Sequence, residues 1–379
     1  MKKTLLAAAL FAGFAGFAGA AQAETQVTLY GILDTGIQVA NVKNSNGTSY
    51  TTAGFANGVE SGPRWGMKGT EDLGGGTQVT FQLESGYQVS NGKSNQGGRL
   101  FGRRAFLGLQ NASWGMVRAG RGPTISTDMF QGANSDPFAY GFGPFNLGNV
   151  ATSINTYRTD NQISYMSPVF AGFQVGAGYS FNVDDVSNTA YGVGKSMGTS
   201  IPGIDVAATY TNGPLFAGLT YGQTEIRGKG AIRQVVLDAS YDFQVVRVYG
   251  AYVRGWNGLV GGTSLGTADG SAVASTILTP AGNSYASGLK QNAFMLGVSA
   301  PIGTATSLFA TYQHQTLSGA GANTLLATAR SAQNTFALGA QYKLSKRTDV
   351  YAAVGYVDGF GNVQGQKETA GVVGMRHQF

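Results

Sequence analysis

The sequence predicts an all-β protein, a transmembrane antiparallel β-barrel of about sixteen strands. Apolar and polar residues alternate along many segments of about ten residues, and these segments are joined by short turns and long polar loops in alternation. After the amino terminus, no run of about 18 apolar residues remains for a membrane-spanning helix. A closed barrel is the other structure whose backbone satisfies its own hydrogen bonds in a bilayer.

The amino terminus has the layout of a cleavable secretory signal. Two lysines precede an apolar run over residues 5–21, and Ala21-Gln22-Ala23 places small residues at its exit. The alternative is an uncleaved membrane anchor, which the short run rich in Ala and Gly disfavours. We therefore expect residues 1–23 to be removed during export and residues 24–379 to form the barrel domain.

The composition excludes several other classes of protein. With 59 glycines, 21 Phe, 18 Tyr and 12% charged residues, the chain fits neither a disordered protein nor a helical membrane protein. It has no cysteine, so a disulfide or a thiol nucleophile is impossible, and no cofactor or metal is expected. Without the two lysines of the signal, 23 basic residues face 19 acidic ones. This net charge of about +4 is spread along the chain, so nucleic acid is not an expected partner.

The alternation is clearest at residues 77–84, 215–223 and 335–344, where every second side chain is apolar. Tight turn signals lie at 72–76, 112–115, 167–172, 212–214, 241–244, 300–303 and 344–347, and longer polar stretches lie near 41–58, 91–98, 122–155, 184–200, 257–289 and 318–331. Short turns at one end and long loops at the other are typical of outer-membrane barrels. A soluble β-sandwich or β-helix also alternates, but here the apolar face repeats at membrane height throughout.

The chain ends inside a predicted strand. From Gly371 onward, Val373, Met375, His377 and Phe379 share one face. A terminal strand that closes on an aromatic residue resembles the ending by which outer-membrane barrels are recognised for assembly. We therefore expect Phe379 to act as the assembly signal and the barrel assembly machinery to be a partner.

Several motifs, taken in order, resemble one family. These are Val27-Thr28-Leu29-Tyr30-Gly31, Arg64-Trp65-Gly66-Met67-Lys68-Gly69, Glu71-Asp72-Leu73-Gly74, Phe81-Gln82-Leu83-Glu84, Gly102-Arg103 to Gly108-Leu109 and Arg376-His377-Gln378-Phe379. The chain resembles the general trimeric porins of Gram-negative outer membranes, especially those of β-proteobacteria. The resemblance spans the chain from the first strand to the terminus.

The resemblance implies a homotrimer in the outer membrane, among its lipid and lipopolysaccharide, that lets ions and small polar solutes diffuse passively. It also implies that the third extracellular loop, residues 122–155, folds into the lumen and carries acidic groups, here Asp128 and Asp136. Where many relatives carry Pro-Glu-Phe-Gly, this chain has Asp136-Pro137-Phe138-Ala139.

Charged residues on lumen parity are the candidate pore residues. Arg64 and Lys68 share one face of a strand, opposite Trp65 and Met67, so their charges are predicted to face the lumen. Glu84 is on lumen parity in the next strand.

Two more arginines are placed in the same way. Arg103 shares parity with Leu107, with Phe106 expected on the lipid side, and Arg158 shares parity with Asp160. The resemblance matches Arg64, Arg103 and Arg158 to the basic cluster on the barrel wall of related porins. Contacts with the rim or headgroups are the alternative for the arginines, as solvated loop positions are for Asp128 and Asp136. The positive excess predicts a mild preference for anions.

Catalysis is the alternative from another class of function. Outer-membrane hydrolases need a positioned base beside a nucleophile or water, usually a histidine. The chain has only His314 and His377, and it lacks Gly-x-Ser-x-Gly and His-Glu-x-x-His. We therefore expect a channel and not an enzyme. A substrate-specific uptake channel stays open as a second alternative.

Overall fold

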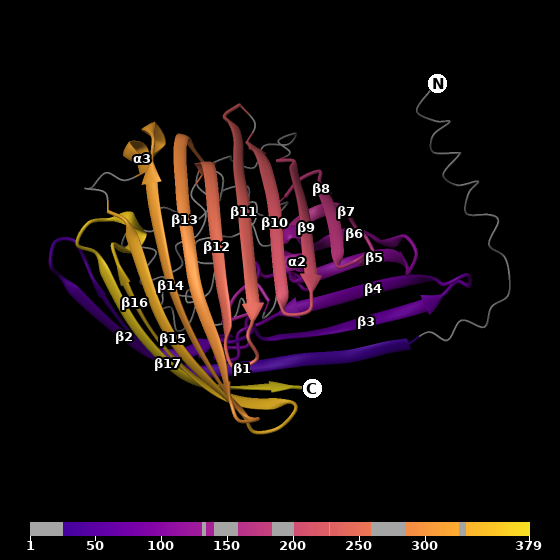
Figure 1. Ribbon diagram of the computed structural model, residues 1–379, viewed down its shortest axis with the longest axis horizontal. Coiled ribbons are helices and arrows are strands. Elements are labelled where there is room, and N and C mark those ends of the chain that lie inside the picture. Colours follow the sequence, from indigo (N-terminus) through magenta and orange to yellow (C-terminus); the bar gives the residue numbers. More distant parts are fainter. Residues whose placement is uncertain are drawn as a thin grey trace.

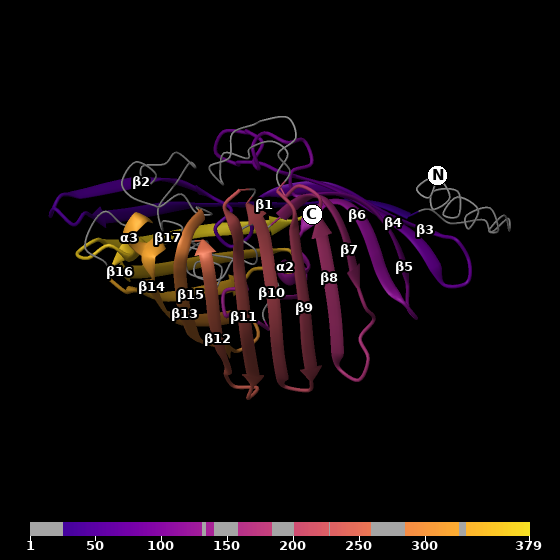
Figure 2. The same ribbon diagram turned by 90° about the horizontal axis from the view of Figure 1, so that it is seen from above.

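The computed structural model describes residues 26–130, 134–139, 158–183, 201–226, 228–258, 285–325 and 331–379. They form one antiparallel sheet that closes on itself where β1 pairs with β17 (Figure 1). Figure 2 shows how the sheet curves, with β9 to β13 on one side and β1 to β3 on the other. The predicted all-β barrel is confirmed. The proposed signal, residues 1–23, lies outside the described residues.

The strands are β1 (Gln26–Lys43), β2 (Ser49–Asn57), β3 (Arg64–Asp72), β4 (Thr77–Gly86), β5 (Arg104–Asn111), β6 (Gly115–Pro123), β7 (Arg158–Met166), β8 (Phe173–Ser180), β9 (Gly203–Asn212), β10 (Leu215–Ile226), β11 (Gly230–Asp242), β12 (Arg247–Gly258), β13 (Tyr285–Ile302), β14 (Thr306–Ser318), β15 (Gln333–Lys343), β16 (Thr348–Asp358) and β17 (Lys367–Gln378). The helical elements are α2 (Ile125–Phe130), α3 (Ala320–Leu325) and the 3₁₀ turn η5 (Phe360–Asn362). Within the described ranges, no helix is both long and apolar enough to cross a membrane.

Two of these strands are halves of one barrel strand. The first part of β1 pairs with β3 and its second part with β2, in one continuous antiparallel direction. The segment 58–63 interrupts them, and we call it the insert. Counting β2 and β3 together gives the sixteen barrel strands that the sequence predicts.

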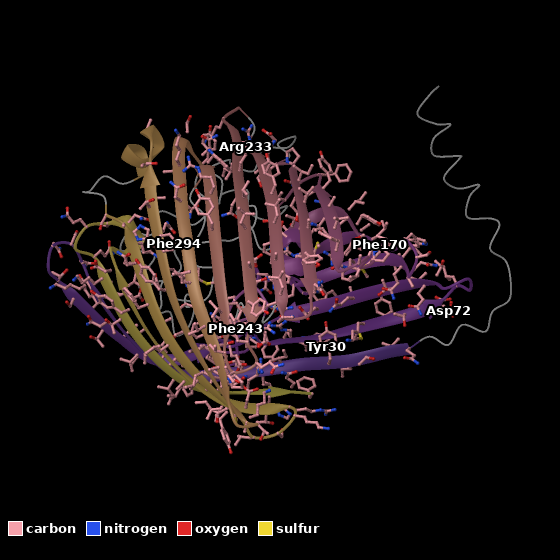
Figure 3. All side chains as sticks on the ribbon, viewed as in Figure 1. Tyr30, Asp72, Phe170, Arg233, Phe243 and Phe294 are labelled. Carbon is pink, nitrogen blue, oxygen red and sulfur yellow. The ribbon has the colours of Figure 1, made fainter. Side chains whose placement is uncertain are left out.

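The two faces of the sheet differ in chemistry, as the alternation predicts. Along β15, Phe336 and Leu338 are exposed on the outward face, while Thr335 and Ala337 are buried on the inward face. The same pattern occurs on β17, where Val373 and Met375 are exposed on the outward face and Val372 is buried on the inward face. Exposed apolar side chains of this kind surround the sheet (Figure 3) and form the surface that a bilayer covers.

Tight turns lie at the predicted positions at residues 73–76, 112–114 and 213–214 among others, whereas the turn predicted at 300–303 lies at 303–305 because β13 continues to Ile302. The polar stretch predicted at 41–58 is wrong, because β1 continues to Lys43 and β2 begins at Ser49. The reason is that the alternation in β2 is weak, because its two large apolar residues, Tyr50 and Phe55, lie on opposite parities of the strand. The loop predicted at 184–200 lies outside the described residues.

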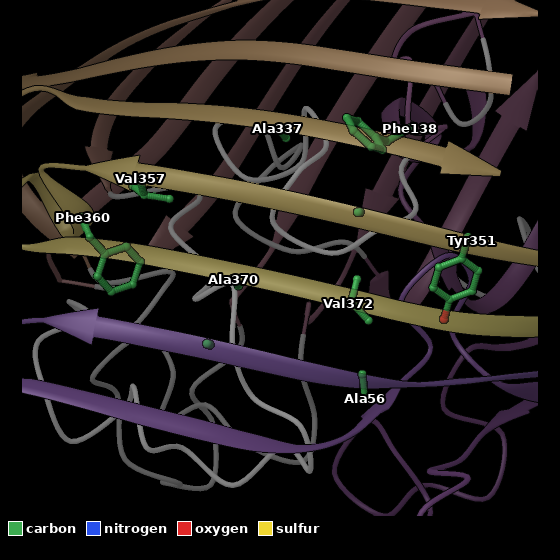
Figure 4. Close-up of a cluster of buried hydrophobic side chains, with 10 residues drawn as sticks. Ala56, Phe138, Ala337, Tyr351, Val357, Phe360, Ala370 and Val372 are labelled. Atoms are coloured by element: carbon green, nitrogen blue, oxygen red, sulfur yellow. The ribbon is translucent and has the colours of Figure 1, made fainter.

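The described parts of segment 122–155 pack on the inward face of the sheet. Phe138 contacts Phe309, with ring centroids 5.5 Å apart, and fills the space beside Gly339 of β15. Figure 4 shows Phe138 with Ala337 in this buried cluster. Pro137 occupies the equivalent space beside Gly297 of β13. Glycines at these two positions therefore make room for the segment.

Candidate functional site

Six arginines gather at one side of the inward face, on β3, β5, β6 and the connection between β4 and β5. We call them the arginine wall, and they are Arg64, Arg99, Arg103, Arg104, Arg118 and Arg121. Strand register explains much of this grouping, because Glu84 of β4 lies directly opposite Arg104 of β5 and so shares its face.

Asp128 of α2 bridges two members of the wall. Its Oδ1 lies 2.8 Å from Arg104 Nη2, and its Oδ2 lies 2.5 Å from Arg118 Nη2. The two arginines come from neighbouring strands, β5 and β6, and Arg118 also donates from Nε to Ser164 Oγ at 2.9 Å. One carboxylate therefore fixes two guanidinium groups and neutralises one of them.

Asp160 of β7 holds a second pair. Its Oδ2 accepts a hydrogen bond from Arg99 Nη2 at 2.9 Å, and its Oδ1 pairs with Arg121. Arg121 also donates from Nε to the carbonyl of Gly102 at 2.8 Å. This second carboxylate thus ties β7 to the connection that precedes β5.

Glu84 holds the remaining part of the wall. Its Oε1 accepts a hydrogen bond from Arg103 Nε at 2.7 Å, its Oε2 accepts one from the Tyr30 hydroxyl at 2.9 Å, and Arg64 interacts with it electrostatically. Lys68 lies over the Tyr30 ring, with its Nζ 5.5 Å from the ring centroid. Six arginines thus face three carboxylates here, so positive charge remains in excess.

Helix α2, which carries Asp128, is held from the opposite side as well. Asp205 of β9 accepts a hydrogen bond from the Ser126 backbone N–H at 2.8 Å. The ring of Phe130 packs edge-on against Phe216 of β10 at a centroid distance of 6.4 Å. The short helix therefore bridges the arginine wall and the strands that face it.

Asp136, the other acidic candidate, lies elsewhere. It is fully buried, and its Oδ1 accepts the backbone N–H of Phe138 at 2.6 Å. This is the geometry of an aspartate that shapes its own turn. The described contacts place Asp136 near Asp238 and Tyr249 of β11 and β12, so it does not join Asp128 at the wall.

One parity prediction is wrong. Leu107 is 61% exposed and Phe106 is buried, so Phe106 faces inward and Leu107 outward. The inward arginine of the strand is therefore Arg104. Arg103 precedes the first residue of β5 and reaches Glu84 because it is free of the strand's alternation.

Arg158 is the first residue of β7, opposite Pro123, and is partly buried. The strand is irregular just after it, because the register with β6 shifts between Thr159 and Gln162 and Asn161 has a φ of 50°. The shared parity of Arg158 with Asp160 stays a prediction. Lys68 and Arg64 do lie on the same face, since they pair with Thr28 and Ile32 of β1.

The sequence reasoning missed Arg99, Arg104, Arg118, Arg121 and Asp160 as site residues. Arg118 could have been found, because it lies inside a strand between the apolar residues Val117 and Ala119. Arg121 and Asp160 could not, because the irregularity near Gly120 and Asn161 alters which face each residue meets.

Comparisons with known proteins agree on one family. A family model described as Gram-negative porin matches residues 6–362. The chain is 42% identical to an outer membrane porin of Bordetella pertussis and 31% identical to outer membrane porin protein 32 of Delftia acidovorans, each over 100% of both chains. Its structure is similar to that of an anion-selective porin from Comamonas acidovorans, with a TM-score of 0.68 and 28% identity, over 94% of this chain and 100% of that one.

Proposed function

Because this chain belongs to the Gram-negative porin family, and so is a diffusion channel of the outer membrane for small hydrophilic solutes, we propose that the arginine wall makes its pore prefer anions. The observation that carries this proposal is the excess of six arginines over three carboxylates on one inward surface. Fixed charges near the path of an ion set its preference, since charges beyond about 8 to 10 Å are screened at physiological salt.

We also propose that the segment around α2 and residues 134–139 narrows the channel. Its support is that α2 is held by Arg104 and Arg118 on one side and by Asp205 on the other. A helix fixed in this way brings Asp128 up to the wall, and the resulting field across the path orders water and penalises apolar solutes. The Comamonas acidovorans relative is described as anion-selective, which agrees with the proposed preference.

A single-channel recording in a salt gradient tests the proposal. We expect discrete conductance steps and a reversal potential that reports a preference for anions. This reversal potential should be larger at low ionic strength, because the fixed charges are screened less there. A reversal potential on the cation side would reject the role proposed for the arginine wall. It would leave the channel function itself intact.

We further propose a homotrimer that is embedded in outer-membrane lipid and lipopolysaccharide and inserted by the barrel assembly machinery. The purified protein should be rich in β-structure by circular dichroism and should migrate in detergent gels as an oligomer that boiling dissociates. The reason is that strands paired throughout a closed sheet resist detergent. Identical migration before and after boiling would reject the trimer alone.

Catalysis is not part of this proposal. His314 donates a hydrogen bond from Nδ1 to Asn334 Oδ1 at 2.8 Å and stacks on outward-facing Phe294, while His377 pairs with Thr348 at 2.9 Å. Both rings therefore have structural partners on the outward side of their strands, away from the arginine wall. The proposed removal of residues 1–23 is a separate step of export.

A further inference from the structure

The insert places an acidic side chain at the seam where the barrel closes. Asp34 of β1 accepts the backbone N–H of Ser61 at 2.6 Å through its side chain and that of Gly58 at 3.0 Å through its carbonyl. These two hydrogen bonds hold the insert against β1. Glu60, between them in sequence, is thereby brought to the inward face of β16 and β17.

The charged and titratable groups that meet Glu60 come from three strands. Arg376 of β17 places Nη1 2.8 Å from Glu60 Oε1 and Nη2 2.8 Å from Asp349 Oδ2 of β16. On the same side, the Tyr351 hydroxyl donates to Asp34 Oδ1 at 2.6 Å. Figure 4 shows Tyr351 on its strand, and its ring fills the space above Gly374 of β17. One guanidinium therefore faces three carboxyl groups.

Two oxygens in this group lack a hydrogen-bond donor. The side chains of Glu60 and Asp349 are both more than nine-tenths buried. Glu60 Oε2 and Asp349 Oδ1 have no hydrogen-bond partner. Gln341 of β15 donates to the other oxygen, Glu60 Oε1. Buried acceptors without a donor are costly, and so are two adjacent buried anions. A single proton on Glu60, shared with Asp349, removes both costs.

The chemistry of Glu60 agrees with that assignment. Glu60 lies in the insert, outside the strands, and burial together with the neighbouring Asp349 raises its pKa from 4.5 to about 9. The carboxyl group is then neutral at physiological pH, although it lies beside an arginine.

The insert also supports two members of the arginine wall. The carbonyl of Gly62 accepts a hydrogen bond from Arg64 Nε at 2.8 Å. A Cβ added at Gly62 would lie 3.1 Å from Arg103 Nη1, so the guanidinium packs against the insert's backbone. Movement of the insert would therefore move both side chains.

We propose that Glu60 is a positioning residue that works in its protonated form: its proton bridges to Asp349 and fixes the insert, which in turn fixes Arg64 and Arg103. The effect on ion preference rests on the proposed function of the wall. The effect on stability does not depend on it.

The sign of the pH dependence follows from the raised pKa. The folded state keeps a proton that the unfolded state loses, so the stabilisation is complete below about pH 4.5 and is lost as pH rises through about 9. Across that window, one proton corresponds to about a tenfold fall in the folding equilibrium constant per pH unit.

Glu60→Gln tests the proposal, because the amide donates to Asp349 permanently and its oxygen still accepts from Arg376. We expect the melting temperature of the parent to fall relative to that of E60Q as pH rises from about 5 to about 9. E60Q should be at least as stable as the parent at the alkaline end. Glu60→Ala, which removes the bridge, should be less stable than E60Q at every pH. Asp358→Asn, at the half-exposed pair with Lys367, is the matched carboxyl-to-amide control and should show no such divergence.

The outcomes separate the two proposals. If E60Q were destabilised as much as E60A at alkaline pH, Glu60 would be an ordinary ionised partner of Arg376 and the inference would be overturned. In the recordings, E60Q should keep the parent's reversal potential and E60A should shift it. Divergent melting curves in a pore without anion preference would support the proton bridge and reject only the function of the wall.

Discussion

Replacing Arg104 and Arg118 together by glutamine is expected to move the reversal potential in a salt gradient toward the cation side. Both guanidinium groups form ion pairs with Asp128, so the variant leaves that carboxylate without its compensating charges. Two unit charges about 8 Å from the ion path in water change the local energy of an ion by about 1 kcal/mol, which is on the order of a fivefold change in the local concentration of each ion. The shift should grow as ionic strength falls.

A matched control uses arginines on the outward face. Arg233, which Figure 3 labels on β11, contacts Gln223, and Arg254 lies over the Trp256 ring. Their double replacement by glutamine removes the same charge from the protein but should leave the reversal potential unchanged. Asp128→Asn should shift it toward anions. Equal shifts in the inward and outward variants would show that net charge, and not the wall, sets the preference.

Deleting Phe379, or replacing it by alanine, is expected to lower the amount of folded protein in the membrane severalfold, with export to the periplasm intact. The terminal residue closes the barrel, because its backbone exchanges two hydrogen bonds of 3.1 Å with Gly31 of β1. Its ring lies over Gly31, where an added methyl group would overlap it. Losing the ring removes apolar contact at the seam as well as the proposed assembly signal.

Gly31→Ala separates these two roles, because it obstructs the folded position of the ring and leaves the terminal sequence unchanged. We expect it to lower folded yield and to add little to the effect of Phe379→Ala, since both remove one contact. Gly371→Ala is the control in the terminal strand, where the nearest atom to an added Cβ is 3.6 Å away. The yield is measured as the heat-modifiable fraction in outer membranes. Normal yield without Phe379 would refute its role in assembly.

The sequence by itself determined the architecture and the charge of this protein. Alternation in segments such as 77–84 and 335–344 assigns each side chain to one face, because successive residues of a strand point to opposite sides. That rule predicts that Arg64 and Lys68 share one face, and they do so on β3. The membrane location also requires the sheet to close into a barrel, since the backbone groups of an open sheet edge would have no hydrogen-bond partners in a bilayer. These inferences depend on local period and solvent alone.

Only the tertiary structure decided how the charges combine. In β5, Phe106 is buried and Leu107 exposed, which is the reverse of the predicted faces. The irregular segment near Asn161 contains Asp160, which pairs with Arg121. A shift of one residue exchanges the two faces of a strand, and no period in the sequence reports where such a shift occurs. The contact of Glu60 with Arg376 joins residues more than three hundred positions apart. Such a pairing exists because the barrel closes, and closure is a property of the whole sheet.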